Sequence, residues 1–135
     1  MDITKALAIS AYGMDVQSTR LRVIAENLAN QDTTGSSPGA DPYRRKVVEF
    51  EDRMDRSLGA ETVHVRRIEP VPGDFALRYD PSHPAADAQG YVKVPNVNSF
   101  VEVMDMREAQ RTYSANLNVL EASRSMLTRT IEMLR

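Results

Sequence analysis

Large apolar residues recur every seven positions at both ends of this chain, and this spacing limits the folds that the chain can adopt. In the N-terminal part, the repeat positions and the two isoleucines beside them are Leu7, Met14, Leu21, Leu28, Ile3 and Ile24. Towards the C-terminus, they are Met106, Tyr113, Leu120, Leu127, Leu134, Val103, Leu117 and Ile131. A seven-residue apolar repeat is typical of helices that pack along their length. The pattern therefore predicts a helix over about 3–30 and a longer one over about 99–135.

Polar residues mark the ends of both predicted helices. Asp2 is a candidate N-cap for the first helix, and Ser99 followed by Glu102 has the pattern of a capping box for the second. Asn30 can close the first helix in the left-handed conformation. Gly13 is unfavourable inside a helix, so its presence indicates a close crossing with another helix.

The middle of the chain, residues 31–98, has a different composition. It holds all seven prolines and five of the six glycines. Three short, partly alternating segments in it favour strands separated by turns: 43–50, 61–68 and 90–94. We therefore expect a mainly α fold, with a small β-rich insert between long N- and C-terminal helices. The corresponding segments are 1–32 for the N-terminal helix, 33–98 for the β and loop insert, and 99–135 for the C-terminal helix.

Each predicted helix carries only one narrow apolar stripe, and two explanations of this stripe stay open. In the first, the two helices cover each other within one chain, as a helical hairpin with an insertion. In the second, neighbouring copies or other partners cover the stripes. A two-helix hairpin buries little surface, and helices outside a bundle are only marginally stable.

Few residues indicate chemistry. His83 lies near Asp80 and Asp87, which suggests a metal site, but no second histidine stands at ligand spacing and a proline-rich turn explains the segment better. The basic cluster "YRRK", residues 43–46, could bind phosphate or an acidic partner, or could be the solvated entry to a strand. The sequence has no nucleophile motif and no glycine-rich phosphate loop. We expect no catalytic, cofactor-binding or metal-binding residues and no enzyme activity, with a small metal-dependent hydrolase around His83 as the enzyme alternative.

Charge, cysteine content and the first residues narrow the cellular context. The formal net charge is -2, which does not indicate nucleic-acid binding. The chain has no Cys, so disulfides and thiolate metal sites are excluded. The N-terminal segment lacks the layout of a cleavable signal peptide, and no apolar run reaches the roughly 18 residues of a membrane-spanning helix. We expect a protein that stays in the cytosol or leaves the cell without a signal peptide.

Side-chain amides recur on both predicted helices. The stretch "NLAN" places Asn27 and Asn30 at the end of the first helix, and Asn116 and Asn118 lie on the second. Such amides can form hydrogen bonds across helix contacts, or they can simply lie on exposed helix surface.

The segment "ALAISAYGMDVQSTRLRVIAENLANQDTTG" resembles the N-terminal signature of the bacterial flagellar rod and hook axial proteins, and "NLAN" with the following Thr-Thr-Gly is its most recognisable part. The segments "PYRRKVVEF", "GYVKVPNVN" and "RTYSAN" resemble the proximal rod members of this family, and the short length agrees with them. The resemblance covers nearly the whole chain.

The resemblance implies a structural subunit of the proximal rod of the flagellar basal body, exported by the flagellar type III apparatus without a cleavable signal peptide. Its N- and C-terminal helices would pair as a coiled coil and form the inner layer of the assembly. Through these helices the subunits would polymerise into a helical tube in the periplasm that transmits torque and conducts exported subunits. Partners would be other copies, other rod proteins, the rod-base protein at the export gate and the surrounding rings, without nucleic acid or direct membrane insertion. A soluble helical-hairpin adaptor or export chaperone is the alternative function.

Two sets of residues are expected to make the contacts of this assembly. The apolar assembly seam consists of Leu7, Met14, Leu21, Ile24, Leu28, Met106, Tyr113, Leu117, Leu120, Leu127, Ile131 and Leu134. The polar assembly contacts are Asn27, Asn30 and Asn116.

Overall fold

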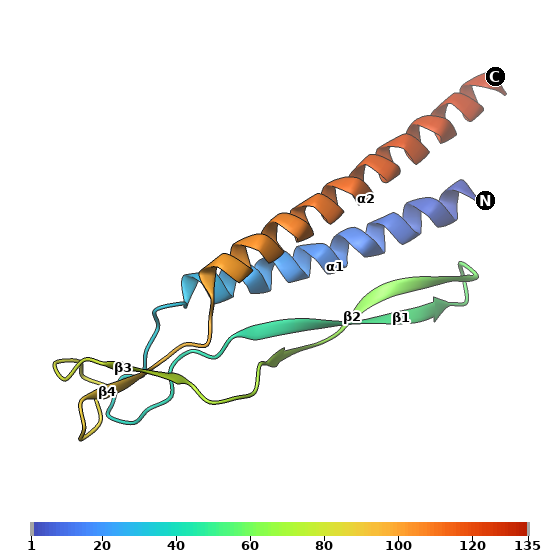
Figure 1. Ribbon diagram of the computed structural model, residues 1–135. Coiled ribbons are helices and arrows are strands. Elements are labelled where there is room, and N and C mark those ends of the chain that lie inside the picture. Colours follow the sequence, from blue (N-terminus) through green and yellow to red (C-terminus); the bar gives the residue numbers. More distant parts are fainter. Residues whose placement is uncertain (1, 135) are drawn as a thin grey trace. The chain divides into compact units, whose positions relative to one another are not determined.

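The computed structural model describes residues 2–134, which form two long helices and four strands. In chain order these are α1 (Ile3–Ala29), β1 (Lys46–Asp55), β2 (Ala60–Pro70), β3 (Ala76–Tyr79), β4 (Tyr91–Val94) and α2 (Ser99–Met133) (Figure 1). Within the described residues, β1 pairs with β2 and β3 pairs with β4, so each sheet has two strands.

The expected fold class is wrong, because the chain is not a mainly α protein whose terminal helices pair as a coiled coil. The helices take 27 and 35 residues, and strands of 10, 11, 4 and 4 residues add two antiparallel sheets. β1 extends five residues beyond the end of its predicted segment, and β2 extends one residue before and two residues after its own. Within α1, the buried residues Val16 and Val23 lie outside the seven-residue seam. The helix therefore buries more than the one stripe that a two-helix seam requires.

Two compact units divide the chain, and the division falls inside both helices and inside both long strands. Unit 1 contains residues 1–21, 48–67 and 107–135, and unit 2 contains residues 22–47 and 68–106. Each unit is described by itself below. The expected division into three consecutive segments concerned the layers of an assembly, so it stays a prediction.

In unit 1, α1 and α2 run antiparallel and touch at two places along their length. Arg20 forms an ion pair with Glu108 at 3.4 Å. Closer to the start of α1, a Cβ added to Gly13 would lie only 2.8 Å from the side-chain amide nitrogen of Asn116. Gly13 therefore lies at a close approach of the two helices, where a larger residue would require the Asn116 side chain to shift.

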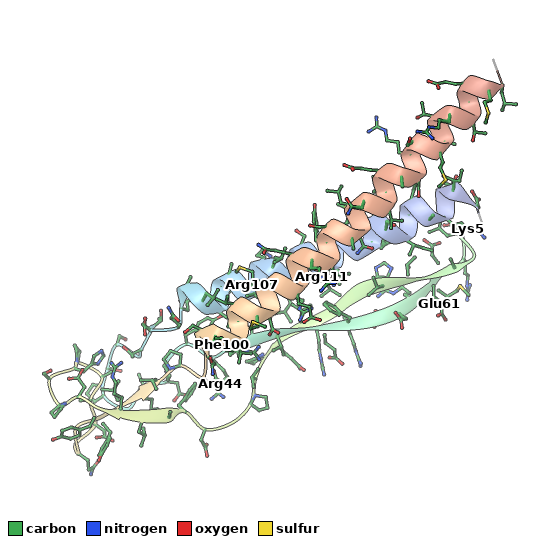
Figure 2. The ribbon with its side chains drawn as sticks, turned by 45° about the horizontal axis from the view of Figure 1, so that its top comes forward. Lys5, Arg44, Glu61, Phe100, Arg107 and Arg111 are labelled. Carbon is green, nitrogen blue, oxygen red and sulfur yellow. The ribbon has the colours of Figure 1, made fainter. Side chains whose placement is uncertain are left out.

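The hairpin formed by β1 and β2 contacts α1 in unit 1 through one pair of rings, and a tight turn joins its two strands. The rings of Tyr12 and His64 lie 4.8 Å apart. Gly59 adopts a φ of 61° in the turn and donates its N–H to the Asp55 carbonyl at 2.8 Å. Lys5 of α1 lies at this turn, with its Nζ 3.5 Å from the position that a Cβ of Gly59 would take (Figure 2). The positive φ, not a lack of space, is what favours glycine at this position.

The carboxylate of Asp55 organises the same turn. It accepts hydrogen bonds from the Ser57 hydroxyl at 2.6 Å, the Ser57 N–H at 2.9 Å and the Leu58 N–H at 3.2 Å. These bonds, above all the one from the Ser57 side chain, lower the pKa of Asp55 because they stabilise the ionised carboxylate.

Unit 2 contains the smaller sheet and the beginning of α2. β3 pairs antiparallel with β4, with Ala76 opposite Val94 and Tyr79 opposite Tyr91. Because β1, β2 and β4 lie at the three segments that favoured strands, those predictions are confirmed, whereas β3 was not predicted.

The start of α2 differs from the expected capping box. Asn98 is the capping residue, since its Oδ1 accepts the N–H groups of Phe100 at 3.0 Å and Val101 at 3.4 Å. Glu102 does not fold back to cap the helix, because its carboxylate is held in the interior of unit 2. The prediction for α1 is confirmed, because the Asp2 carboxylate accepts the Thr4 N–H at 3.0 Å.

Candidate functional site

Asn27, from the "NLAN" stretch, is the centre of a buried polar cluster in unit 2. Its side chain is only 1 % exposed. Its Nδ2 donates to the Lys46 carbonyl at 2.9 Å and to the Glu102 carboxylate at 3.1 Å. Its Oδ1 accepts the Lys46 N–H and the Tyr43 hydroxyl, each at 2.9 Å. All four hydrogen-bonding positions of the amide are therefore used, and they join α1, β1 and α2.

Glu102 is the second centre of this cluster, and its side chain is 0 % exposed. A buried carboxylate is costly unless it is paired and hydrogen-bonded. Here it forms an ion pair with Arg45, and it also accepts the amide of Asn27. Arg45 is itself fixed, because its backbone N–H donates to the Asn96 side chain at 2.7 Å and its guanidinium reaches Asp105 at 3.4 Å.

Tyr43 closes the cluster as a hydrogen-bond donor. Burial raises the pKa of its hydroxyl, and the nearby carboxylates of Glu26 and Glu102 raise it further. Both effects disfavour the phenolate. The hydroxyl therefore keeps its proton and continues to donate to Asn27 well into the alkaline range.

The basic cluster at residues 43–46 is occupied within the chain. The Arg44 guanidinium donates to the carbonyls of Val71 at 3.0 Å and Gly73 at 2.8 Å, and it lies over the ring of Phe75 (Figure 2). Arg45 pairs with Glu102, and Lys46 pairs with Glu26. These side chains connect segments of unit 2, which explains the cluster without a bound anion.

Asn30 ends α1 through its side chain. Its Nδ2 donates to the Glu26 carbonyl at 2.9 Å, and its Oδ1 accepts the Thr33 hydroxyl at 3.1 Å. The expected left-handed conformation is wrong, since no residue other than glycine has a positive φ in residues 2–134. Asn30 is thus a local cap, whereas Asn27 connects distant segments.

Asn116 lies against Gly13 in the α1–α2 contact of unit 1. The other predicted polar position on α2, Asn118, is exposed. The roles of Asn27, Asn30 and Asn116 in contacts between subunits stay predictions. Within one chain, each of these three side chains already has a defined neighbour.

The apolar seam falls into three groups by burial. Ile24 is buried. The half-buried group consists of Leu7, Met14, Leu21, Leu28, Met106, Tyr113, Leu117 and Leu120. The exposed group consists of Leu127, Ile131 and Leu134. Whether these residues form contacts between subunits is a prediction that one chain does not test.

The buried row of α2 was not found from the sequence. It runs beside the predicted seam, also at seven-residue spacing, and consists of Glu102, Ala109 and Ser123, with the half-buried Asn116 between the last two. Small and polar residues in this row carry no hydrophobic signal. Their regular spacing alone could have indicated a close helix contact.

The two histidines are part of local packing. His83 accepts the Ala85 N–H on Nδ1 at 3.0 Å, and its Nε2 lies 3.2 Å from the Thr34 hydroxyl. His64 contacts Tyr12 and the Thr62 hydroxyl. In residues 2–134, no group of three or more His, Cys, Asp and Glu side chains is arranged to hold a metal ion.

Neither described helix is long and apolar enough to cross a membrane.

Comparison with known proteins gives a consistent result over nearly the whole chain. Residues 88–133 match the family model "Flagellar basal body rod FlgEFG protein C-terminal". The chain is 49% identical over 133 residues to the flagellar basal-body rod protein FlgC of Agrobacterium fabrum, which covers 98% of this chain and 96% of that protein. It is 42% identical to FlgC of Aquifex aeolicus, over 98% of this chain and 97% of that protein. It is 37% identical to FlgC of Salmonella typhimurium, over 98% of this chain and 98% of that protein.

Proposed function

Given that this chain belongs to the FlgC family of flagellar basal-body rod proteins and is a structural subunit of the basal-body rod, we propose that it polymerises through its terminal helices. The product is the helical tube of the proximal rod. This tube transmits torque and conducts exported subunits. The single observation that carries the proposal is the exposed apolar end of α2.

The end of α2 extends beyond the start of α1 in unit 1. The two helices are antiparallel, and Asn116 lies opposite Gly13. Counting the same distance along both helices, Ile3 at the start of α1 lies level with Met126 of α2. The last two turns of α2 therefore have no α1 residue beside them within residues 2–134, as Figure 1 shows at the end marked C.

Apolar residues continue through this overhanging end. Leu120 is half-buried, but Leu127, Ile131 and Leu134 on the same side of the helix are 39 %, 56 % and 83 % exposed. A contiguous exposed apolar patch marks an interaction site in a soluble protein. Since these residues continue the side of α2 on which Leu120 is half-buried, another subunit is the natural cover for them.

The buried cluster around Asn27 and Glu102 supports the mechanical part of the proposal. It connects both terminal helices to β1 through charged and amide groups that are fully paired. Such a network holds its members in one arrangement. A subunit that passes torque to its neighbours needs fixed connections of this kind between its helices and its strands.

The proposed partners follow from the family. They are other copies of the chain, other flagellar rod proteins, the rod-base protein at the export gate, the surrounding basal-body rings and the flagellar type III export apparatus. The proposed location is the rod within the periplasm, reached by export without a cleavable signal peptide.

Trypsin digestion tests the polymerisation, because Arg129 lies at the end of α2 that α1 does not cover. The digest compares the purified chain with isolated basal bodies, followed by mass spectrometry. We expect rapid cleavage at Arg129 in the free chain and protection in basal bodies. Cleavage at Arg107, where α1 lies beside α2, serves as the control and should be slow in both samples. Equal cleavage at Arg129 in both samples would show that the end of α2 makes no contact in the rod.

A further inference from the structure

A groove on the outer side of α1 in unit 1 has the dimensions of a docking site. Its volume is about 410 Å³, and it is lined by Ala8, Ala11, Tyr12 and Asp15. Ala11, Tyr12 and Asp15 follow Ala8 by three, four and seven positions, so the four residues lie on one side of the helix. Gly13, which faces α2, is two positions from both Ala11 and Asp15 and therefore points to the opposite side. The groove therefore lies away from α2. Its residues Ala11 and Asp15 are exposed, and Tyr12 borders the neighbouring hairpin through its ring contact with His64.

The groove combines an apolar floor with one charge. Ala8 and Ala11 provide little side-chain bulk, which lets another helix approach closely, and Tyr12 forms an aromatic wall. Asp15 stands at the end of the groove, is exposed, and has no hydrogen bond or ion pair with any residue in 2–134. A ligand for this groove needs an apolar surface with a cation at one end.

The end of α2, from Arg124 into the overhang, has this composition over the same length. Arg124, Leu127 and Ile131 are spaced by three and four residues, so they share one side of the helix. All three are exposed. Arg124 has no ion pair with any residue in the described part of the chain. The distance along the helix from Arg124 to Ile131 equals that from Ala8 to Asp15, since each spans seven residues.

We propose that the end of α2 of one copy docks in the α1 groove of a second copy. Arg124 pairs with Asp15, Leu127 lies against Ala11 and Tyr12, and Ile131 reaches Ala8. The two helices are antiparallel in this contact, as α1 and α2 are within one chain. This inference rests on the proposed polymerisation and names the two surfaces that form one of its contacts.

The proposed contact has a definite symmetry. The groove and the overhang are different surfaces of one molecule, so the contact is head-to-tail. A head-to-tail contact produces an open helical filament when its rotation does not close a ring. Each contact covers only about two helical turns, so it acts together with others in the filament.

Cysteine crosslinking tests the contact directly, because the natural chain has no Cys. The full-length variants Ala11→Cys and Leu127→Cys are mixed and oxidised. We expect the mixed disulfide to be the main dimer, since a disulfide needs the two Cα atoms within about 7 Å. The matched control is Asn118→Cys, an exposed position on the side of α2 away from α1. The proposal is overturned if Asn118→Cys crosslinks to Ala11→Cys as well as Leu127→Cys does, or if disulfides between identical variants dominate.

Charge reversal tests the pairing of Asp15 with Arg124 in the same assay. The reversal Asp15→Arg, added to the Ala11→Cys chain, should lower the yield of mixed disulfide by about twofold to fivefold, as expected for an exposed ion pair. The reversal Arg124→Asp, added to the Leu127→Cys chain, should do the same. Mixing the two reversed chains should restore the yield. Failure of this restoration would exclude the ion pair.

The digest of basal bodies distinguishes failure of this contact from failure of the proposed function. Protection at Arg129 in basal bodies without an 11–127 crosslink would mean that α2 is covered by a different surface. In that case the docking proposal is wrong, and polymerisation through the terminal helices stands. If Arg129 is not protected in basal bodies and the 11–127 crosslink does not form, both the docking proposal and the proposed polymerisation are rejected.

Discussion

At the scale of single residues, Asn27 carries an unusual share of the polar contacts of unit 2. Its removal in Asn27→Ala would leave the Lys46 N–H and carbonyl unpaired and would take one partner from the buried Glu102. Unpaired buried groups each cost about 1–3 kcal/mol. We therefore expect Asn27→Ala to lower the free energy of unfolding of the purified chain by about 2–4 kcal/mol, measured by urea denaturation.

The matched control for this prediction is Asn118→Ala, which removes the same amide from an exposed helix position. Its effect should stay within about 0.5 kcal/mol. If the two variants have equal stability, the cluster around Asn27 does not hold the unit together. Loss of assembly without loss of stability in Asn27→Ala would instead favour the predicted contact between subunits.

Tyr43 gives the same cluster a pH dependence. Its pKa is raised above the ordinary value of 10.0 by burial and by two carboxylates, so the folded chain binds this proton more tightly than the unfolded chain. The associated stability is fully present below pH 10 and is lost as the pH rises through the folded-state pKa. Tyr43→Phe should lose this alkaline dependence and about 1 kcal/mol of stability at neutral pH, through the lost hydrogen bond to Asn27.

Denaturant titrations from neutral to alkaline pH measure this effect. The four other tyrosines titrate in both proteins, so the difference between the two curves isolates Tyr43. Parallel curves over the whole pH range would contradict the assignment. A spectroscopic titration of tyrosinate should show one group in the natural chain that ionises later than the others.

The sequence indicated that the "NLAN" amides matter but not how each is used. Asn27 and Asn30 look alike in the sequence, yet one connects distant segments and the other ends its own helix. The partner of Asn27, Glu102, matched a capping box and is instead buried. Local patterns describe local hydrogen bonds, whereas a bond between residues 75 positions apart depends on the fold.

At the scale of secondary-structure elements, the contact of α1 with α2 depends on Gly13. Alanine normally stabilises a helix by about 1 kcal/mol relative to glycine. Here the added Cβ would meet the Asn116 side chain at 2.8 Å. We expect Gly13→Ala to destabilise the chain by about 1 kcal/mol, because overpacking exceeds the gain in helix propensity.

A double-mutant cycle with Asn116→Ala checks this explanation. Once the Asn116 amide is gone, Gly13→Ala should become stabilising by about 0.5–1 kcal/mol. The change of sign between the two backgrounds, measured by thermal or urea unfolding, is the diagnostic result. Stabilisation by the same amount in both backgrounds would mean that the helices do not approach closely at this point.

Helix positions could be predicted well from the sequence, but packing could not. The seven-residue repeat placed both helices within a few residues of their observed ends. It did not show that Val16 and Val23 are buried outside the seam, nor that a row of small residues on α2 lies buried. β3 was missed because "ALRY" is exposed along its whole length, so it lacks the apolar alternation of a half-buried strand.

At the scale of the whole molecule, the exposure of the α2 seam residues shows which of them are covered within one chain and which are left for contacts with other subunits. The seam residues Met106, Tyr113 and Leu120 are half-buried, whereas the seam residues after Met126 are exposed. The sequence pattern continues unchanged through both regions. Periodicity could not show where the partner within the chain ends, because that depends on how the antiparallel helices are aligned.

The exposed end of α2 should matter for assembly and not for the stability of the free chain. The double variant Ile131→Glu with Leu134→Glu places charges on residues that are already 56 % and 83 % exposed, so unfolding of the free chain should change by no more than about 0.5 kcal/mol. Burial of an unpaired charge between subunits is strongly unfavourable. We therefore expect the variant to be absent from isolated basal bodies and to leave cells non-motile.

The matched control, Asn118→Glu with Ser125→Glu, adds the same charge to the opposite side of α2 and should retain motility. Normal motility with the first variant would mean that the rod does not cover this end of the helix, and loss of motility with both would show that α2 tolerates no added charge on either side.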